Sequence, residues 1–134
     1  MKKKYVNMHI KDDIQRNTEV EEVTLPTIIA VDFDGTLCDG CWPDIGEPNL
    51  KLIGELIYRR SLGNKLILWS CRAGEQLKQA VEWCNSYGLI FDAVNDNIPE
   101  IVEKYGSNSR KITADIYIDD KSEKPWYSLL KVAV

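Results

Sequence analysis

The stretch Thr27-Ile-Ile-Ala-Val-Asp-Phe-Asp-Gly-Thr-Leu37 carries most of the information about the fold. It begins with a continuous run of apolar, largely β-branched residues, which is typical of a strand buried on both faces of a parallel sheet. The run ends in two aspartates separated by one residue. Asp32 and Asp34 are therefore expected on one side of the strand end, with Phe33 on the other. Gly35 then allows a sharp turn.

Further strands and helices are predicted to alternate along the rest of the chain. Apolar residues at helical spacing, each series ending near a glycine, predict helices near 50–62, 77–87 and 98–105. Short apolar runs predict strands at 65–70, 91–94 and 114–118, and 126–130 is open as a helix or a strand. Such alternation implies parallel strands joined by right-handed crossovers. The predicted fold class is α/β, a three-layer α/β/α Rossmann-like fold with a mainly parallel central sheet.

Length and composition indicate one globular domain preceded by a short extension. The chain has 134 residues, of which 44% are hydrophobic and 28% are charged, as in ordinary globular proteins. We expect an N-terminal extension at 1–24, able to add an edge strand or a short helix, and a single domain at 25–134. No apolar run is long enough to span a membrane, and no apolar segment follows the basic start as in a secretory signal. These features exclude a membrane protein, a disordered chain and a disulfide scaffold, and they favour a cytoplasmic location.

Charge and reactive residues narrow the chemistry. The net charge of −4 disfavours a general nucleic-acid coat, which needs an excess of Lys and Arg, and leaves room for a local basic patch. The single histidine, His9, lies near the terminus, so acid–base chemistry has to rest on carboxylates. Cys38 and Cys41 have the spacing of a zinc knuckle, but no second close pair accompanies them. Reduced, mostly buried thiols are the favoured interpretation, and a redox pair between these two cysteines is left open.

Acidic residues follow two of the predicted strands. In parallel α/β sheets, ligands bind at the carboxyl ends of the strands. The candidate residues at these ends are Asp32, Asp34, Asp119 and Asp120. One such aspartate alone would be an ordinary loop residue. Several in one crevice repel one another and call for a cation, and hard oxygen ligands favour Mg²⁺.

The turn after the first strand also fits covalent phosphoryl transfer. Asp32 is a plausible nucleophile that would form an aspartyl-phosphate, and Asp34 is placed to protonate the leaving oxygen and later to activate water. The backbone N–H groups at Gly35 and Thr36 are expected to bind phosphate as an anion nest.

At this point a family resemblance is visible over residues 27 to about 124. Ile29-Ala-Val-Asp-Phe-Asp-Gly-Thr-Leu37 resembles the first motif of the haloacid dehalogenase superfamily of phosphohydrolases. Leu66-Ile-Leu-Trp-Ser70 resembles the second motif, Lys111 the third-motif lysine, and Ile116-Tyr-Ile-Asp-Asp120 the fourth motif. The resemblance implies an Mg²⁺-dependent phosphatase that acts through an aspartyl-phosphate.

The resemblance also implies a role for each motif residue. Asp32 would be nucleophile and Mg²⁺ ligand, and Asp34 would be the acid/base, with its backbone carbonyl on the metal. Ser70 would bind the phosphoryl group, and Lys111 would neutralise charge, although Lys121 and Lys124 are alternatives. Asp119 would complete the metal sphere, with Asp120 bound directly or through water. Arg72 has two readings, a contact with the substrate phosphate or a neighbouring group, and a surface ion pair.

The lengths of the connections bear on the substrate. Neither the segment after the first motif nor the one before Lys111 is long enough for a cap domain, so a capless enzyme with an open site is expected. Open sites suit bulky phosphorylated partners such as a nucleic-acid end or a phosphoprotein. Trp42 is expected either to stack on a base or sugar or simply to pack. Ser70-Cys-Arg72 and Ile118-Asp-Asp-Lys121 are similar to stretches of the phosphatase domain of polynucleotide kinase.

Two rival functions stay open at this point. The first is a non-catalytic module that binds phosphate and Mg²⁺. The second is a receiver-like signalling domain with a phosphorylated aspartate. The stretch Lys124-Pro-Trp126 resembles the Lys-Pro-aromatic corner of such domains. The order of the acidic motifs along the chain disfavours the receiver. The oligomeric state is left open by the sequence.

Overall fold

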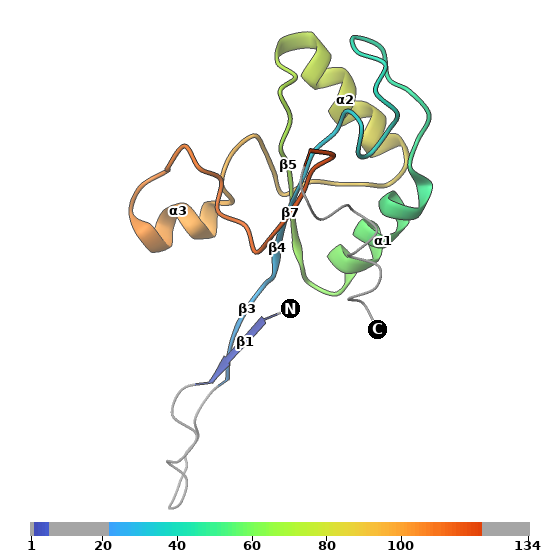
Figure 1. Cartoon of the computed structure of the whole chain (residues 1–134). Coiled ribbons are helices and arrows are strands. Elements are labelled where there is room, and N and C mark those ends of the chain that lie inside the picture. The colour runs from blue at the N-terminus through green and yellow to red at the C-terminus, as the bar shows by residue number, and fades with distance from the viewer. Residues whose placement is uncertain (1, 6–21, 122–134) are drawn as a thin grey trace, which may run out of the picture.

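The computed structural model describes residues 2–5 and 22–121, and a parallel sheet of four strands forms its centre (Figure 1). The strands are β4 (Ile28–Val31), β5 (Lys65–Leu68), β6 (Ala93–Val94) and β7 (Ile116–Ile118). The helices between them are α1 (Leu50–Ser61), α2 (Gly74–Ser86) and α3 (Pro99–Tyr105). The predicted α/β fold with a parallel sheet is confirmed.

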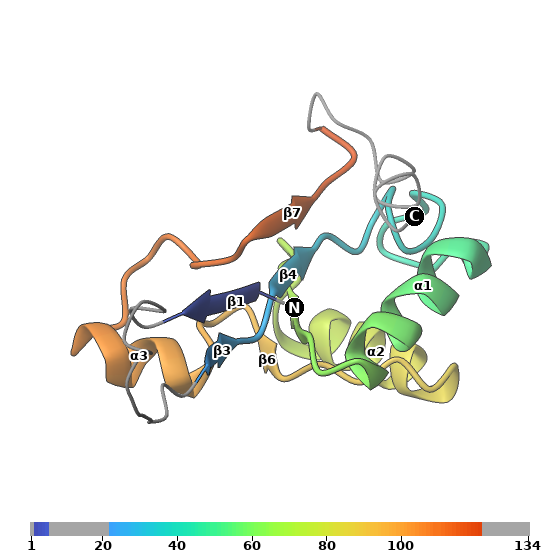
Figure 2. The same cartoon turned by 90° about the horizontal axis from the view of Figure 1, so that it is seen from below.

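Two apolar clusters, one on each face of the sheet, hold the three layers together. α1 and α2 cover one face and α3 covers the other, as both views show (Figures 1 and 2). The larger cluster joins alternate residues of β4 and β5 to Leu52 and Leu56 of α1 and Ala80 and Cys84 of α2. The smaller one places the intervening strand residues against Ile98 and Ile112. β4 is buried along its whole length because both faces are covered.

Two strands begin later than the sequence pattern predicts, and a carboxylate accounts for each difference. Asp92 accepts a hydrogen bond from the backbone of Leu66 at 2.8 Å, ahead of β6. Asp115 likewise accepts from the backbone of Ile28 at 2.8 Å, ahead of β7. In both places a side chain supplies a bond that a longer strand would have made through its backbone. The predicted strands 91–94 and 114–118 therefore begin later, at 93 and 116.

The strand order places a crevice between β4 and β7. The strands lie in the order β6-β5-β4-β7 across the sheet. Numbered along the chain from β4 as the first strand, this order is 3-2-1-4. This is the Rossmann order, whereas receiver domains share the order 2-1-3-4-5 of flavodoxin. The chain leaves β4 toward one side and enters β7 on the other, so the carboxyl ends of these two strands form the switch point where ligands bind in such sheets.

The remaining described segments add no cap to this sheet. Residues 32–49 contain no helix or strand, and 95–115 contain only the short α3. β1 (Lys2–Tyr5) and β3 (Glu22–Leu25) form a separate antiparallel ribbon, which does not extend the edge of the main sheet. Among the helices described, none has the length and apolar character needed to cross a bilayer. The prediction for 126–130 and the alternative lysine Lys124 lie outside the described residues.

Candidate functional site

An acidic hollow of about 350 Å³ opens at the carboxyl ends of β4 and β7. Asp32 follows β4 directly, and its backbone N–H donates to the carbonyl of Ile118 at 2.8 Å, which ties the two strand ends together. Phe33 is fully buried in the larger core cluster, so Asp32 and Asp34 face the hollow as the strand pattern predicts. The hollow is lined by Asp32, Asp34, Gly35, Gly40, Cys71, Asp119, Asp120 and Lys121.

Three of these carboxylates are close enough to share one cation. Asp32, Asp119 and Asp120 each offer an oxygen, and these oxygens lie within 4.8 Å of one another. A set of three hard anionic oxygens matches the ligand preference of Mg²⁺, which also retains waters and so leaves positions for a phosphate. The side chain of Asp34 lines the same hollow but is not part of this trio. The sequence prediction for Asp34 concerned its backbone carbonyl, which stays a predicted ligand.

The crowding of carboxylates shifts the protonation of Asp32. Burial of this half-buried carboxyl raises its pKa from the ordinary 3.8 to about 7. A hydrogen bond from the backbone N–H of Phe33 acts in the opposite direction, while the charges of Asp119 and Asp120 raise the pKa further. A divalent cation bound by the trio would oppose both the burial penalty and the repulsion. The donor set of three carboxylates is thus compatible with a bound divalent cation.

The turn after Asp34 braces the site and does not offer an anion nest. The N–H of Gly35 donates to the carbonyl of Cys38 at 2.9 Å, and that of Thr36 to the carbonyl of Phe33 at 3.1 Å. The buried Thr36 hydroxyl contacts the Asp32 carboxylate at 3.5 Å. The expectation that Gly35 and Thr36 bind phosphate is thus corrected, because their N–H groups are engaged within the turn and the Thr36 hydroxyl faces Asp32.

Gly35 is required by its neighbour Asp120. Its φ of +81° lies in the region that side chains rarely adopt, and a Cβ added there would come within 2.5 Å of Oδ2 of Asp120. We expect Gly35→Ala to displace Asp120, to weaken Mg²⁺ binding and to lower the free energy of unfolding by about 1–2 kcal/mol. Calorimetric titration with Mg²⁺ and denaturant unfolding measure the two effects.

Gly40 supplies the matched control for this substitution. It lines the same hollow, but a Cβ added there would meet nothing within 4 Å. Gly40→Ala should leave both Mg²⁺ binding and stability near their original values. Equal effects of the two substitutions would contradict the assignment of Asp120 to the metal site.

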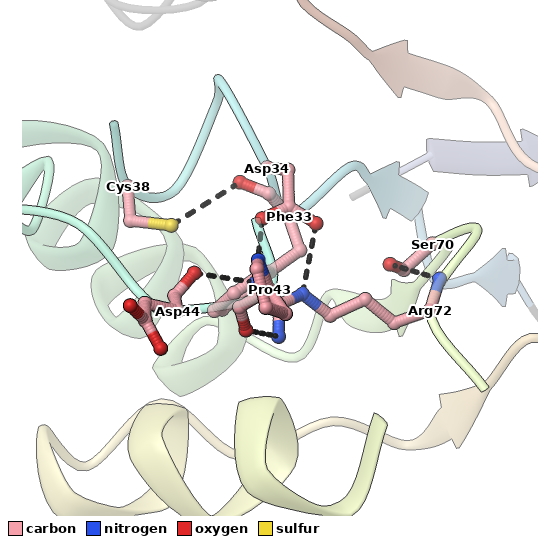
Figure 3. Close-up of polar contacts among 7 residues, drawn as sticks. All are labelled: Phe33, Asp34, Cys38, Pro43, Asp44, Ser70 and Arg72. Atoms are coloured by element: carbon pink, nitrogen blue, oxygen red, sulfur yellow. Dashed lines mark hydrogen bonds and ion pairs between the residues drawn. The ribbon is translucent and has the colours of Figure 1, made fainter. Parts of the chain in front are cut away.

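Arg72 clamps the carboxylate of Asp34, as Figure 3 shows. Its Nε and Nη2 donate to the two carboxylate oxygens of Asp34, each at 2.8 Å. Further bonds reach the carbonyls of Pro43 at 3.2 Å and Asp44 at 2.9 Å. Arg72 is only 2% exposed. The ion pair predicted at the surface is therefore buried on the Arg72 side. Most of the guanidinium N–H groups donate to Asp34 and to loop carbonyls, so few remain for the predicted contact with a substrate phosphate.

Ser70 and Asn95 shape the loop that carries Arg72. The Ser70 oxygen accepts from the N–H of Arg72 at 3.0 Å, and the N–H of Ser70 donates to Oδ1 of Asn95 at 2.7 Å. Ser70 is not among the residues that line the acidic hollow, and its predicted phosphate contact stays a prediction. The supporting role of Asn95 was missed in the sequence, where the one available signal is an asparagine directly after a strand, a residue that tolerates its positive φ of 51°.

Of the predicted lysines, the structure places Lys121 at the acidic hollow among the described residues. Lys111 is exposed and does not line the hollow, and its predicted contact with phosphate stays a prediction. Lys121 does line it, and its backbone N–H donates to Oδ1 of Asp119 at 3.2 Å.

All four cysteines are free thiols, so Cys38 and Cys41 form no disulfide. Among residues 2–5 and 22–121, neither of these two belongs to a group of three or more candidate metal ligands.

Comparison with known proteins gives a structural relative without a stated activity. No known family profile and no curated protein sequence matches the chain. A solved structure of a conserved protein from Bacteroides thetaiotaomicron is similar, with 38% sequence identity and a TM-score of 0.69. The similarity covers 82% of this chain and 93% of that one.

Proposed function

We propose that this chain, which belongs to the same family as the conserved protein from Bacteroides thetaiotaomicron, is an Mg²⁺-dependent phosphomonoester hydrolase. The observation that carries the proposal is the convergence of Asp32, Asp119 and Asp120 at the sheet's switch point, with Asp34 held beside them. The motifs resemble those of the haloacid dehalogenase superfamily, and the absence of a cap among residues 22–121 favours an open, capless site.

Each residue has a defined part in the proposed reaction. A carboxylate oxygen of Asp32 attacks phosphorus while the bond from phosphorus to the ester oxygen breaks. The protonated Asp34 gives its proton to that leaving oxygen. Water then attacks the phosphorus of the aspartyl-phosphate and passes a proton to Asp34. The bond to Asp32 breaks, which releases inorganic phosphate and restores both carboxyl groups. Bound Mg²⁺ would supply charge neutralisation for the carboxylates and the phosphoryl oxygens.

Asp34 can serve as acid and base while it is bound to Arg72. Each carboxylate oxygen has two lone pairs, and Arg72 uses one on each oxygen. A remaining lone pair of Asp34 can therefore face the leaving oxygen while the contact with Arg72 stays intact. The ammonium of Lys121, which lines the same hollow, is the candidate to balance the negative charge of the substrate phosphate.

A phosphatase screen with and without Mg²⁺ tests this proposal. The panel should contain sugar phosphates, nucleotides, phosphopeptides, 3′-phosphorylated oligonucleotides and p-nitrophenyl phosphate. Hydrolysis that disappears on chelation and returns with Mg²⁺ is expected. Mg²⁺ binding without hydrolysis of any ester would instead favour a non-catalytic binding module. An aspartyl-phosphate that lasts for minutes would favour a receiver-like role.

The proposal also includes a cytoplasmic location. Residues 38, 41, 71 and 84 are all free cysteines, and unpaired thiols persist in a reducing compartment.

A further inference from the structure

An exposed tryptophan lies beside Asp34 and its partner Arg72. Trp42 is 59% exposed, on the loop between β4 and α1. The guanidinium carbon of Arg72 lies 4.9 Å from the centre of its ring, and the same carbon lies 5.0 Å from the centre of the Phe33 ring. Arg72 is thus in contact with two aromatic rings, one buried and one at the surface. The indole is fixed by a buried partner and still presents most of its surface to solvent, which is the character of a preorganised contact for a ligand.

A second hollow lies beside Trp42 and shares two lining residues with the acidic hollow. It has a volume of about 240 Å³ and is lined by Asp34, Trp42, Cys71 and Arg72. Asp34 and Cys71 line both hollows. In the proposed reaction Asp34 protonates the oxygen of the leaving group. The organic part of the substrate therefore emerges next to Asp34, on the side where the Trp42 hollow opens.

The charges around this second hollow argue against a polyanionic leaving group. Besides Asp34, the loop at residues 35–50 contains three acidic side chains, Asp39, Asp44 and Glu47, and no Lys or Arg. Arg72 lines the hollow, but its charge is already paired with Asp34. A leaving group with several phosphates would meet repulsion from this loop, whereas a ring of low charge would not.

We propose that Trp42 determines specificity by stacking on a planar ring in the leaving group. The substrate class is then a small phosphomonoester whose alcohol carries a phenolic ring or a nucleoside, with no further phosphate. This inference rests on the proposed hydrolase function and specifies its substrate. The ring stacks on the exposed part of the indole, and the ester oxygen lies toward Asp34.

Kinetics on paired substrates test the role of Trp42. The probes are phenyl phosphate, a nucleoside 5′-monophosphate and glycerol phosphate, which lacks a ring. Trp42→Ala should lower kcat/KM for the ring-bearing esters between about 5-fold and about 100-fold. It should leave kcat/KM for glycerol phosphate within about 2-fold. Trp42→Phe should retain most of the activity on ring-bearing esters, and the ratio of the two ring substrates distinguishes a phenolic from a nucleoside source.

Two kinetic results would overturn the inference. An equal loss of kcat/KM on all three substrates would show that Trp42 only packs against Arg72 and does not contact the leaving group. Faster hydrolysis of a 3′-phosphorylated oligonucleotide than of the mononucleotide would contradict the preference for a leaving group of low charge.

A binding measurement separates this inference from the hydrolase proposal. Titration with a nucleoside or with phenol should quench tryptophan fluorescence saturably in the wild type and in Trp69→Phe, but not in Trp42→Phe. Trp69 is a suitable control because its ring packs against Tyr117 at 5.4 Å. Should the wild type hydrolyse no ester, the hydrolase proposal fails while the titration still decides whether Trp42 binds rings. No saturable quenching, or the same quenching in Trp42→Phe, would refute the stacking role.

Discussion

Replacing Asp32 with asparagine is expected to abolish ester hydrolysis and at the same time to stabilise the metal-free protein at neutral pH. Asparagine has nearly the same shape, but it is not a nucleophile toward phosphorus. We expect kcat to fall by at least about 1,000-fold. Initial rates at saturating Mg²⁺ measure this effect.

The stability change follows from the raised pKa of Asp32. Its pKa is about 7 in the folded chain against 3.8 for the ordinary carboxyl, so the folded state binds the proton more tightly than the unfolded state. The free energy of unfolding of the metal-free protein therefore falls as pH rises from about 4 to about 7. Asp32→Asn removes this loss. Allowing for the solvent that the half-buried group still meets, the gain at pH 7.5 is about 1–2 kcal/mol, with little gain near pH 4.

Urea unfolding at the two pH values, in the presence of a chelator, measures this gain. Asp44→Asn is the control, since Asp44 is an exposed acidic residue of the neighbouring loop and lies outside the carboxylate trio. It should give no comparable gain. An Asp32→Asn protein that is less stable than the wild type at pH 7.5 would contradict the raised pKa of Asp32.

Substituting Arg72 with lysine should produce the second large effect, a loss of both stability and activity. Lysine keeps the charge but cannot bind both oxygens of Asp34 and the carbonyls of Pro43 and Asp44 at once. We expect the free energy of unfolding to fall by about 2–3 kcal/mol. We also expect kcat to fall by about 10-fold to 100-fold, because Asp34 loses its orientation.

The leaving-group dependence separates a positioning role from a merely structural one. If Arg72 holds the acid Asp34, the loss of kcat in Arg72→Lys is larger for an alkyl phosphate than for p-nitrophenyl phosphate, whose leaving group needs little protonation. The control is Arg60→Lys, which alters an ion pair between Arg60 and Asp92 near the surface. This pair should contribute less than about 1 kcal/mol. Equal losses on both esters would show that Arg72 serves folding alone.

Most of the fold could be predicted because its signals are local. The apolar run at 28–31 is buried on both faces, and the apolar residues of α1 fall on the face that contacts the sheet. The strand ends were less predictable, since Asp92 and Asp115 replace backbone bonds with side-chain bonds to partners far along the chain. The separate ribbon of β1 and β3 has no sequence signal that distinguishes it from an added edge strand.

The convergence of Asp32, Asp119 and Asp120 was predictable for a geometric reason, and the hydrogen-bonded residues around them were not. Parallel strands end at one edge, so Asp32 and the Asp119-Asp120 pair had to approach each other once β4 and β7 were neighbours. The burial of Arg72 depends on Asp34, which lies 38 residues away. The choice between Lys111 and Lys121 depends on which end of β7 faces the hollow. Neither spacing nor composition contains this information.

The most direct test of the central claim is to locate the phosphoryl group on the protein during turnover. Asp34→Asn should slow the attack of water more than it slows reaction with p-nitrophenyl phosphate, so that the aspartyl-phosphate accumulates. Acid quenching followed by peptide mass spectrometry should then find one phosphoryl group on Asp32, only when Mg²⁺ is present. A phosphoryl group on another residue, or hydrolysis with Asp32 never modified, would contradict the account.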